Sequence, residues 1–202
     1  MSERAIAELI LHLGRLAQGD GFAAGLTPAQ WNALRYFARA NCFSRTPSAF
    51  AEFHGTTRGT ASQTTKSLVA QGYLARTRSE ADGRSARHDL TNKARAILAE
   101  DPLRALVHAA GAVPSGARGH LANALERMLG HVARECGKRP FGSCTSCKYL
   151  EGDGCCREGE PPYHCVLLGE PLTEAALQQL CINFVPGRNS VMKRTFAEEA
   201  PK

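Results

Sequence analysis

Apolar positions recur at helical spacing along residues 3–70, in segments separated by capping residues, prolines and glycines. Thr27 followed by Pro28 is typical of a helix start, because the threonine side chain caps the first turn and proline is preorganised for it. Gly72 is typical of a helix end, since glycine readily adopts the left-handed conformation that follows a last turn. The pattern predicts four helices, over residues 3–17, 28–40, 47–53 and 57–70.

A short β-hairpin is expected directly after the fourth helix. Residues 73–76 are predicted to form a strand, residues 80–85 a polar turn and residues 87–90 the returning strand. The third and fourth helices, joined by a tight turn at Gly55, form a helix-turn-helix unit, and the hairpin forms its wing. In such units the second helix enters the major groove of DNA.

The opening helix and a long helix that ends near Cys136 both carry an apolar stripe. Thr91 caps a short helix after the wing, and two prolines, Pro102 and Pro114, precede the long one. A compact winged helix has no place for two additional amphipathic helices, so part of their apolar surface is expected to form a dimer core. The stripe of the long helix consists of Leu121, Leu125, Met128, Leu129 and Val132.

The net charge of +6 comes from one part of the chain. Residues 35–95 hold eleven Lys or Arg against four Asp or Glu, which leaves +7, whereas residues 136–202 are balanced. A positive segment of this kind suits a phosphate-binding face, although a solvated basic surface gives the same pattern. No run approaches the roughly 20 apolar residues of a membrane span, so a cytoplasmic protein with no membrane partner is expected.

Three stretches, taken in order, resemble the MarR family of bacterial winged-helix regulators over roughly residues 5–135. They are residues 62–74, which end in Leu-Val-Ala-Gln-Gly-Tyr-Leu, the wing sequence Asp82-Gly83-Arg84, and Leu90-Thr91 at the start of the next helix. The resemblance implies an obligate two-fold homodimer that binds palindromic operators in double-stranded DNA and usually represses transcription.

The resemblance also implies roles for individual residues. Ser62 and Gln63 would approach base edges, where a glutamine amide can pair with adenine. Arg84 would enter the minor groove, whose narrow form attracts arginine, and other basic residues would hold phosphates. With Arg87 of the returning strand included, the predicted DNA-binding set is Arg58, Ser62, Gln63, Lys66, Arg76, Arg84 and Arg87.

Six of the eight cysteines lie within 38 residues behind this unit. Cys144 and Cys147 form a C-x-x-C pair, whose thiolates can point from one turn toward the same ion. This pair, followed by Cys165 and Cys181, resembles cysteine-rich tails fused to some MarR-like proteins, and that resemblance favours these four as the metal ligands. Adjacent cysteines seldom both bind one centre, which leaves two as alternates: Cys155 and Cys156.

The spacing of these cysteines favours an iron-sulfur cluster over zinc. Zinc ribbons commonly have two C-x-x-C pairs, whereas this chain has one pair followed by irregular single cysteines among glycines. A 4Fe-4S cluster is therefore expected, with structural zinc or a 2Fe-2S cluster as alternatives. His164 could replace a thiolate, although a surface histidine is the commoner case, and the Cys155-Cys156 pair could be a reactive thiol site. Cys42 is expected to be a small buried hydrophobe.

The fold class expected is mainly α with a small β-wing, a winged helix-turn-helix dimer plus a small cysteine-rich metal-binding extension. The domains expected are a DNA-binding and dimerisation domain over residues 1–136, a metal-cluster segment over 137–186 and a flexible tail over 187–202. The function predicted is transcription regulation, with repression favoured, in which a cluster that responds to redox state, nitric oxide or iron supply controls operator affinity through the dimer helices.

Two other classes of protein compete with this interpretation. The first is a MarR-like repressor in which the tail holds structural zinc and the signal is a small molecule or a thiol oxidant. The second is an electron-transfer or redox enzyme. The sequence argues against the enzyme, because it has no dinucleotide-binding fingerprint, no flavin motif and no Ser/His/Asp order that would suggest catalysis.

Overall fold

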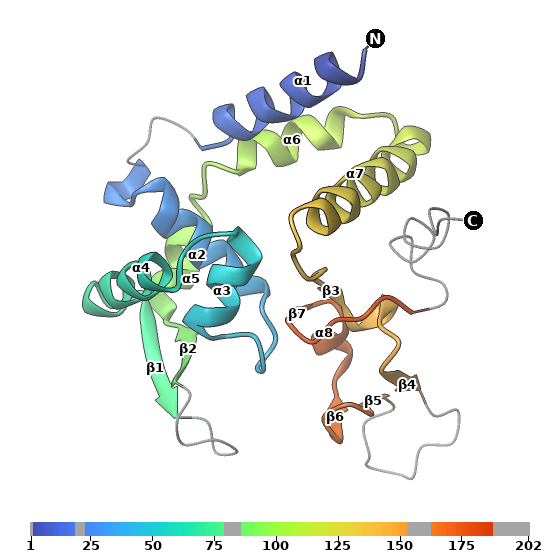
Figure 1. Cartoon of the computed structure of the whole chain (residues 1–202). Helices are drawn as coiled ribbons and strands as arrows, with labels where there is room; N and C mark the ends of the chain where they lie inside the picture. The colour runs from blue at the N-terminus through green and yellow to red at the C-terminus, as the bar shows by residue number, and fades with distance from the viewer. Residues whose placement is uncertain (1, 19–22, 79–85, 153–162, 188–202) are drawn as a thin grey trace.

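The computed structural model describes residues 2–18, 23–78, 86–152 and 163–187. Figure 1 shows three parts, which we call the winged-helix unit (residues 26–98), the terminal helices and the cysteine-rich segment (residues 137–187). The terminal helices lie at the top of that view, with the winged-helix unit below them on the left and the cysteine-rich segment on the right.

The winged-helix unit is built from helices that begin at threonine caps. In each of these helices the threonine hydroxyl accepts a hydrogen bond from a backbone N–H three residues later. Gly72, at a φ of 74°, follows the end of the fourth helix as expected. The wing is an antiparallel pair in which Leu74 faces Leu90. The elements are α2 (Pro28–Arg39), α3 (Pro47–His54), α4 (Arg58–Ala70), β1 (Leu74–Arg78), β2 (Ala86–Leu90) and α5 (Asn92–Leu98).

The core of this unit lies between α2, α3 and α4. Trp31, Tyr36 and Phe37 of α2 are almost completely buried, and the rings of Tyr36 and Phe37 meet edge to face with centroids 5.4 Å apart. Leu68 of α4 closes the core from the other side. Leu180, from the cysteine-rich segment, packs into the same core, so the segment is joined to the winged-helix unit by apolar contact as well as by the chain.

The terminal helices leave most of their apolar surface open. They are α1 (Glu3–Leu16), α6 (Arg104–Ala112) and α7 (Ser115–Glu135), all within the described residues, and Gly130 is their one buried residue. The exposed apolar side chains include the stripe expected on the long helix. They are Ile6, Leu9, Ile10, Leu11, Leu13, Leu16, Val107, Leu121, Leu125, Met128, Leu129 and Val132.

The cysteine-rich segment has little regular structure and consists of short strands and single turns. β3 pairs with β7, and β4, β5 and β6 form a three-stranded antiparallel sheet. The bounds are β3 (Gly142–Ser143), η2 (Cys144–Ser146), β4 (Leu150–Gly152), β5 (Tyr163–Cys165), β6 (Glu170–Leu172), α8 (Glu174–Leu177) and β7 (Leu180–Cys181). A short 3-10 turn, η1 (Ala23–Gly25), precedes α2.

The expectation for Cys42 is wrong, because its side chain is exposed. Helix α2 ends at Arg39, and the buried positions of the following loop are taken by Asn41 and Ser44, which have hydrogen-bond partners there. The expected wing turn over residues 80–85, with Arg84, lies outside the described residues, as does the tail after residue 187. Within the described part of the chain, no helix has the length and apolar character needed to cross a membrane.

Candidate DNA interface and cysteine site

Helix α4 presents one face to the core and the other to solvent. Ala61, Thr65 and Leu68 are buried, whereas Gln63 and Lys66 are exposed. The hydroxyl of Thr65 donates to the Ala61 carbonyl at 2.7 Å, so this polar side chain is satisfied inside the helix. The two exposed side chains lie on the solvent face of the helix, where a partner can reach them.

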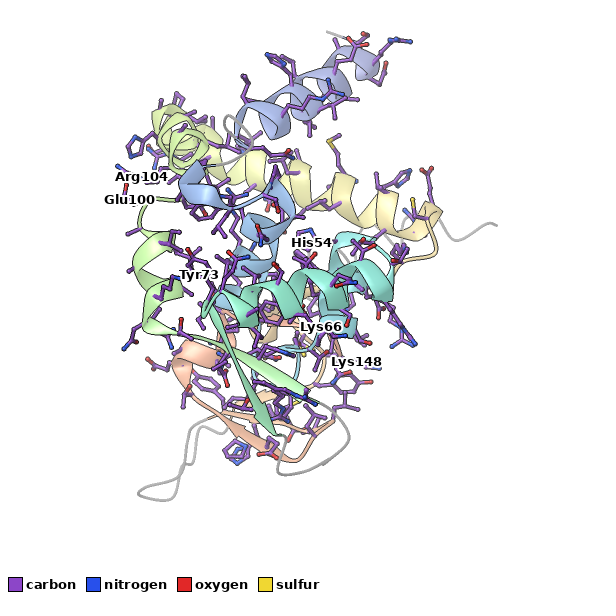
Figure 2. The ribbon with its side chains drawn as sticks, turned by 90° about the vertical axis from the view of Figure 1, so that its left-hand side faces the viewer. His54, Lys66, Tyr73, Glu100, Arg104 and Lys148 are labelled. Atoms are coloured by element: carbon purple, nitrogen blue, oxygen red, sulfur yellow. The ribbon has the colours of Figure 1, made fainter. Side chains whose placement is uncertain are left out.

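A cavity of about 410 Å³ separates α4 from the base of the wing. Ser62 and Lys66 of α4 and Arg76 of β1 line it, together with His88 of β2. Three members of the predicted DNA-binding set therefore surround one cavity at the junction of α4 and the wing. Figure 2 labels Lys66 on α4.

The remaining members of the set lie around this junction. Arg58 is the exposed first residue of α4. Arg87, on β2, is half-buried, with its guanidinium 5.9 Å from the ring centre of Phe43. Burial, followed by the nearby charge of Arg76, lowers the pKa of His88, which keeps this buried ring neutral beside its cationic neighbours. The base of the wing therefore carries positive charge on its surface, from Arg76 and Arg87, above a neutral buried histidine.

The four cysteines singled out in the sequence line a single small cavity of about 10 Å³. Cys144 and Cys181 are buried, and Cys147 and Cys165 are half-buried. All four are free thiols. The structure therefore brings together, from three places in the chain, the residues that were expected to act together.

Three local arrangements produce this convergence. The 3-10 turn η2 places the Cys147 N–H 3.0 Å from the Cys144 carbonyl, which folds the C-x-x-C pair into one turn. Pairing of β3 with β7 sets Cys181 opposite Gly142, two residues before Cys144. Pairing of β4 with β5 sets Cys165 opposite Leu150, three residues after Cys147.

Gly142 is the tightest point of this arrangement. A Cβ atom at this position would lie 2.6 to 2.8 Å from three ring atoms of Phe184, which is itself only 4% exposed. The ring of Phe184 therefore occupies the space that any side chain at position 142 would need. The close approach fixes β3 against the turn that follows β7.

The donor chemistry of the pocket suits a thiophilic metal, whereas its volume of about 10 Å³ is that of a single small group, so a 4Fe-4S cluster requires the thiols to move apart. Burial, and next the other thiols around the pocket, raises the pKa of Cys144 to about 11, because charged thiolates crowded in an apolar site repel one another. A bound cation would reverse that balance and hold the thiols as thiolates. Leu150, Leu172 and Leu177 pack around the site and shield it from water.

Two polar groups near the sulfur of Cys181 add to this fit. The Asn41 side chain and the Asn183 backbone oppose the rise in pKa that burial causes at this thiol. Donors of this kind orient and tune metal-bound sulfurs. Among the residues that the structure describes, however, no three His, Cys, Asp or Glu side chains are grouped as a ready-made ion site.

Of the other candidate ligands named from the sequence, the one within the described residues, His164, does not line this pocket. His164 lies between Tyr163 and Cys165 in β5, and because successive strand residues face opposite ways it points away from the side that Cys165 uses. The alternates Cys155 and Cys156 lie outside the described residues. Cys42 lies close enough to Cys144 to influence its charge, although it does not line the pocket.

Sequence reasoning missed the loop between α2 and α3 as part of this site. Asn41 and Ser44 form hydrogen bonds with the cysteine-rich segment, and no spacing or motif in residues 40–46 indicates it. The partners are about 140 positions apart in the chain, and only the folded structure brings them together.

These features define the class of protein: a winged-helix protein with an attached four-cysteine pocket. Residues 24–85 match the model of the MarR family. A MarR transcriptional regulator from Methanosarcina mazei Go1 has the same fold, with a TM-score of 0.53 at 22% identity over 65% of this chain and 99% of that one. The transcriptional regulator SlyA also has this fold, with a TM-score of 0.53 at 20% identity over 64% of this chain and 95% of that one. No curated protein matches the chain.

Proposed function

We propose that the protein is a homodimeric, DNA-binding transcriptional regulator in which α4 reads the major groove and the wing contacts the flanking backbone. The observation that carries this proposal is the junction of α4 and the wing, where Ser62, Lys66 and Arg76 share one cavity wall. Lys66 and Arg76 supply positive charge for phosphates, and the exposed amide of Gln63 is available to a base edge.

The open apolar surface of the terminal helices supports the dimer. Leu129 is 65% exposed and Leu16 is 64% exposed, and monomeric proteins rarely leave so many large apolar side chains together in water. A two-fold dimer would present two copies of α4 to one face of the duplex, about one helical turn apart. A palindromic operator follows from that arrangement, and we propose that the protein represses transcription by occupying it.

We further propose that Cys144, Cys147, Cys165 and Cys181 hold a 4Fe-4S cluster. Support comes from an all-cysteine donor set around one pocket, from the apolar side chains that surround it, and from the donors at Cys181. When bound, such a cluster would supply sensitivity to oxidants, nitric oxide or iron supply. The protein's own residues would orient the sulfurs, and apolar side chains would cover the two buried ones, those of Cys144 and Cys181.

The second candidate is a repressor that holds structural zinc in this pocket and senses a small molecule. A cavity of about 570 Å³ between α3 and the end of α7 favours it, since Phe53, Leu129, Val132 and Phe141 give that cavity an apolar lining. In this case the metal would stabilise the cysteine-rich segment, and the signal would enter elsewhere.

Anaerobic purification followed by iron, sulfide and zinc analysis separates the two candidates. The cluster predicts about four irons per chain and a broad absorption band near roughly 400 nm that disappears in Cys144→Ala. One zinc per chain in a colourless protein would reject the cluster. The regulator itself is tested by selecting duplexes from a random library, and recovery of no preferred sequence would contradict it.

A further inference from the structure

The loop of residues 40–46, which we call the linking loop, connects α2 to α3 and touches the cysteine-rich segment directly. The backbone N–H of Asn41 donates to the Leu180 carbonyl at 2.9 Å, and the N–H of Ile182 donates to the Ser44 hydroxyl at 2.8 Å. The residue between those two partners is Cys181, and the Asn41 side chain lies near its sulfur. One predicted metal ligand is therefore held from both sides by this loop.

The contact is buried and its polar groups are paired. Asn41 is 3% exposed and Ser44 is fully buried. The Ser44 hydroxyl donates to Asn41 Oδ1 at 2.7 Å, and the Ser44 carbonyl accepts from the Tyr36 hydroxyl at 2.7 Å. Removing one member of such a network leaves a desolvated partner unsatisfied, so its geometry is held tightly.

The same loop holds the wing and starts α3. The Arg45 carbonyl accepts from the His88 N–H at 2.8 Å, and its guanidinium pairs with the Asp89 carboxylate at 2.6 Å. The adjacent residue, Thr46, caps α3 through its hydroxyl. Both parts that orient α4 toward DNA, the preceding helix and the wing, are thus attached to the loop that contacts Cys181.

We propose that the linking loop couples the cysteine site to DNA binding, with Asn41 and Ser44 as the positioning residues. Metal bound at Cys181 fixes residues 180–182, and through them the loop, α3 and the wing. Loss of the metal releases this strand and lets the loop adopt a second arrangement, with a different presentation of α4. A ligand shifts such an equilibrium only by preferring one arrangement, and the direct contact at Cys181 supplies the preference. The inference rests on the proposed metal-dependent regulator and names its route.

Two measurements on the full-length protein test the route. The first is hydrogen exchange of wild type in the iron-loaded form and after removal of iron by a chelator. Exchange at residues 40–46 is expected to rise on iron removal, while exchange at residues 115–135 of α7 is unchanged. The second is DNA affinity of both forms, measured on a duplex selected from a random library, for wild type, Ser44→Ala and Ser67→Ala. Ser67→Ala is the matched control, because its hydroxyl also has two hydrogen-bond partners, the side chains of Gln30 and Gln71, and neither belongs to the cysteine-rich segment.

We expect iron removal to change the DNA affinity of wild type and Ser67→Ala by about tenfold, a typical coupling between two sites. Ser44→Ala is expected to keep its iron and its absorption band. Its DNA affinities with and without iron are expected to differ by less than twofold. A full response in Ser44→Ala would overturn the route and leave the regulator intact. No response in wild type would overturn the metal-dependent regulator and the route together. If Ser44→Ala does not fold, hydrogen exchange in the wild-type protein tests the proposal instead. Exchange at residues 40–46 that is the same before and after iron removal would refute it.

Discussion

Replacing Gly142 by alanine should open the cysteine site without touching a cysteine. The added Cβ would lie 2.6 Å from Cζ of Phe184, against roughly 3.5–4.0 Å for an unstrained carbon contact. Phe184 is only 4% exposed and borders a cavity of about 340 Å³, so relieving the contact requires its ring to leave its present packing. Overpacking of this kind costs about 1–3 kcal/mol.

The strain falls on the strand pair that joins the two halves of the site. Gly142 faces Cys181 across β3 and β7, so a shift of β3 separates Cys144 from Cys181. Because the segment must be folded to bind metal, a strain of about 1–3 kcal/mol should weaken metal binding by about 5- to 150-fold. The result should appear as faster loss of metal to a competing chelator.

The assay is a chelator titration of the purified protein, followed by metal analysis. Gly116→Ala is the control, because a Cβ on this α7 residue meets no atom within 4 Å. Phe184→Leu in the Gly142→Ala background should restore part of the affinity, because it removes the ring atoms that clash and the two changes are directly coupled. Wild-type metal retention by Gly142→Ala alone would show that the close approach does not hold the site together.

Three further predictions concern the interface, the ligand set and the dimer. Lys66→Ala should weaken binding to every duplex and lower the salt slope by about one, whereas Gln63→Ala should mainly relax sequence preference; equal losses on all sequences in filter-binding assays would contradict the role of Gln63. Cys181→Ser should lose the metal while Cys42→Ser keeps it, which metal analysis of both variants checks, and loss in both would enlarge the ligand set. Leu129→Glu, at a side chain that is 65% exposed, should convert the dimer to monomers in sedimentation experiments if the open face of α7 is the interface.

The winged-helix unit could be predicted from the sequence because its signals are local. Thr27 and Thr91 lie where the first turns of helices begin, and each hydroxyl accepts the expected backbone hydrogen bond. The wing strands follow directly after α4 and pair with their nearest neighbour in the chain. Such elements need only short-range information, which the order of caps, apolar positions and turns contains.

For the cysteine-rich segment, the sequence indicates which cysteines act together but not how the short strands pair to bring them together. The C-x-x-C pair is a local signal, and in the structure its two cysteines line one pocket with Cys165 and Cys181. The pairing of β3 with β7 joins positions nearly 40 residues apart through strands of two residues each, too short to show a period. The exposure of Cys42 was missed for a similar reason, since it depends on Asn41 and Ser44 taking the buried positions of that loop.

The location of the linking loop decides how a signal at the cysteines would reach DNA. The sequence suggested a route through the end of α7, which would change the spacing between two recognition helices. The hydrogen bonds at Leu180 and Ile182 instead reach the loop that starts α3 and holds the wing of the same chain. A change transmitted in this way alters how each protomer presents its own α4, so the two protomers of a dimer should respond independently. DNA affinity should then vary gradually with iron occupancy, whereas a change in spacing requires both protomers to switch together and would give a steep response.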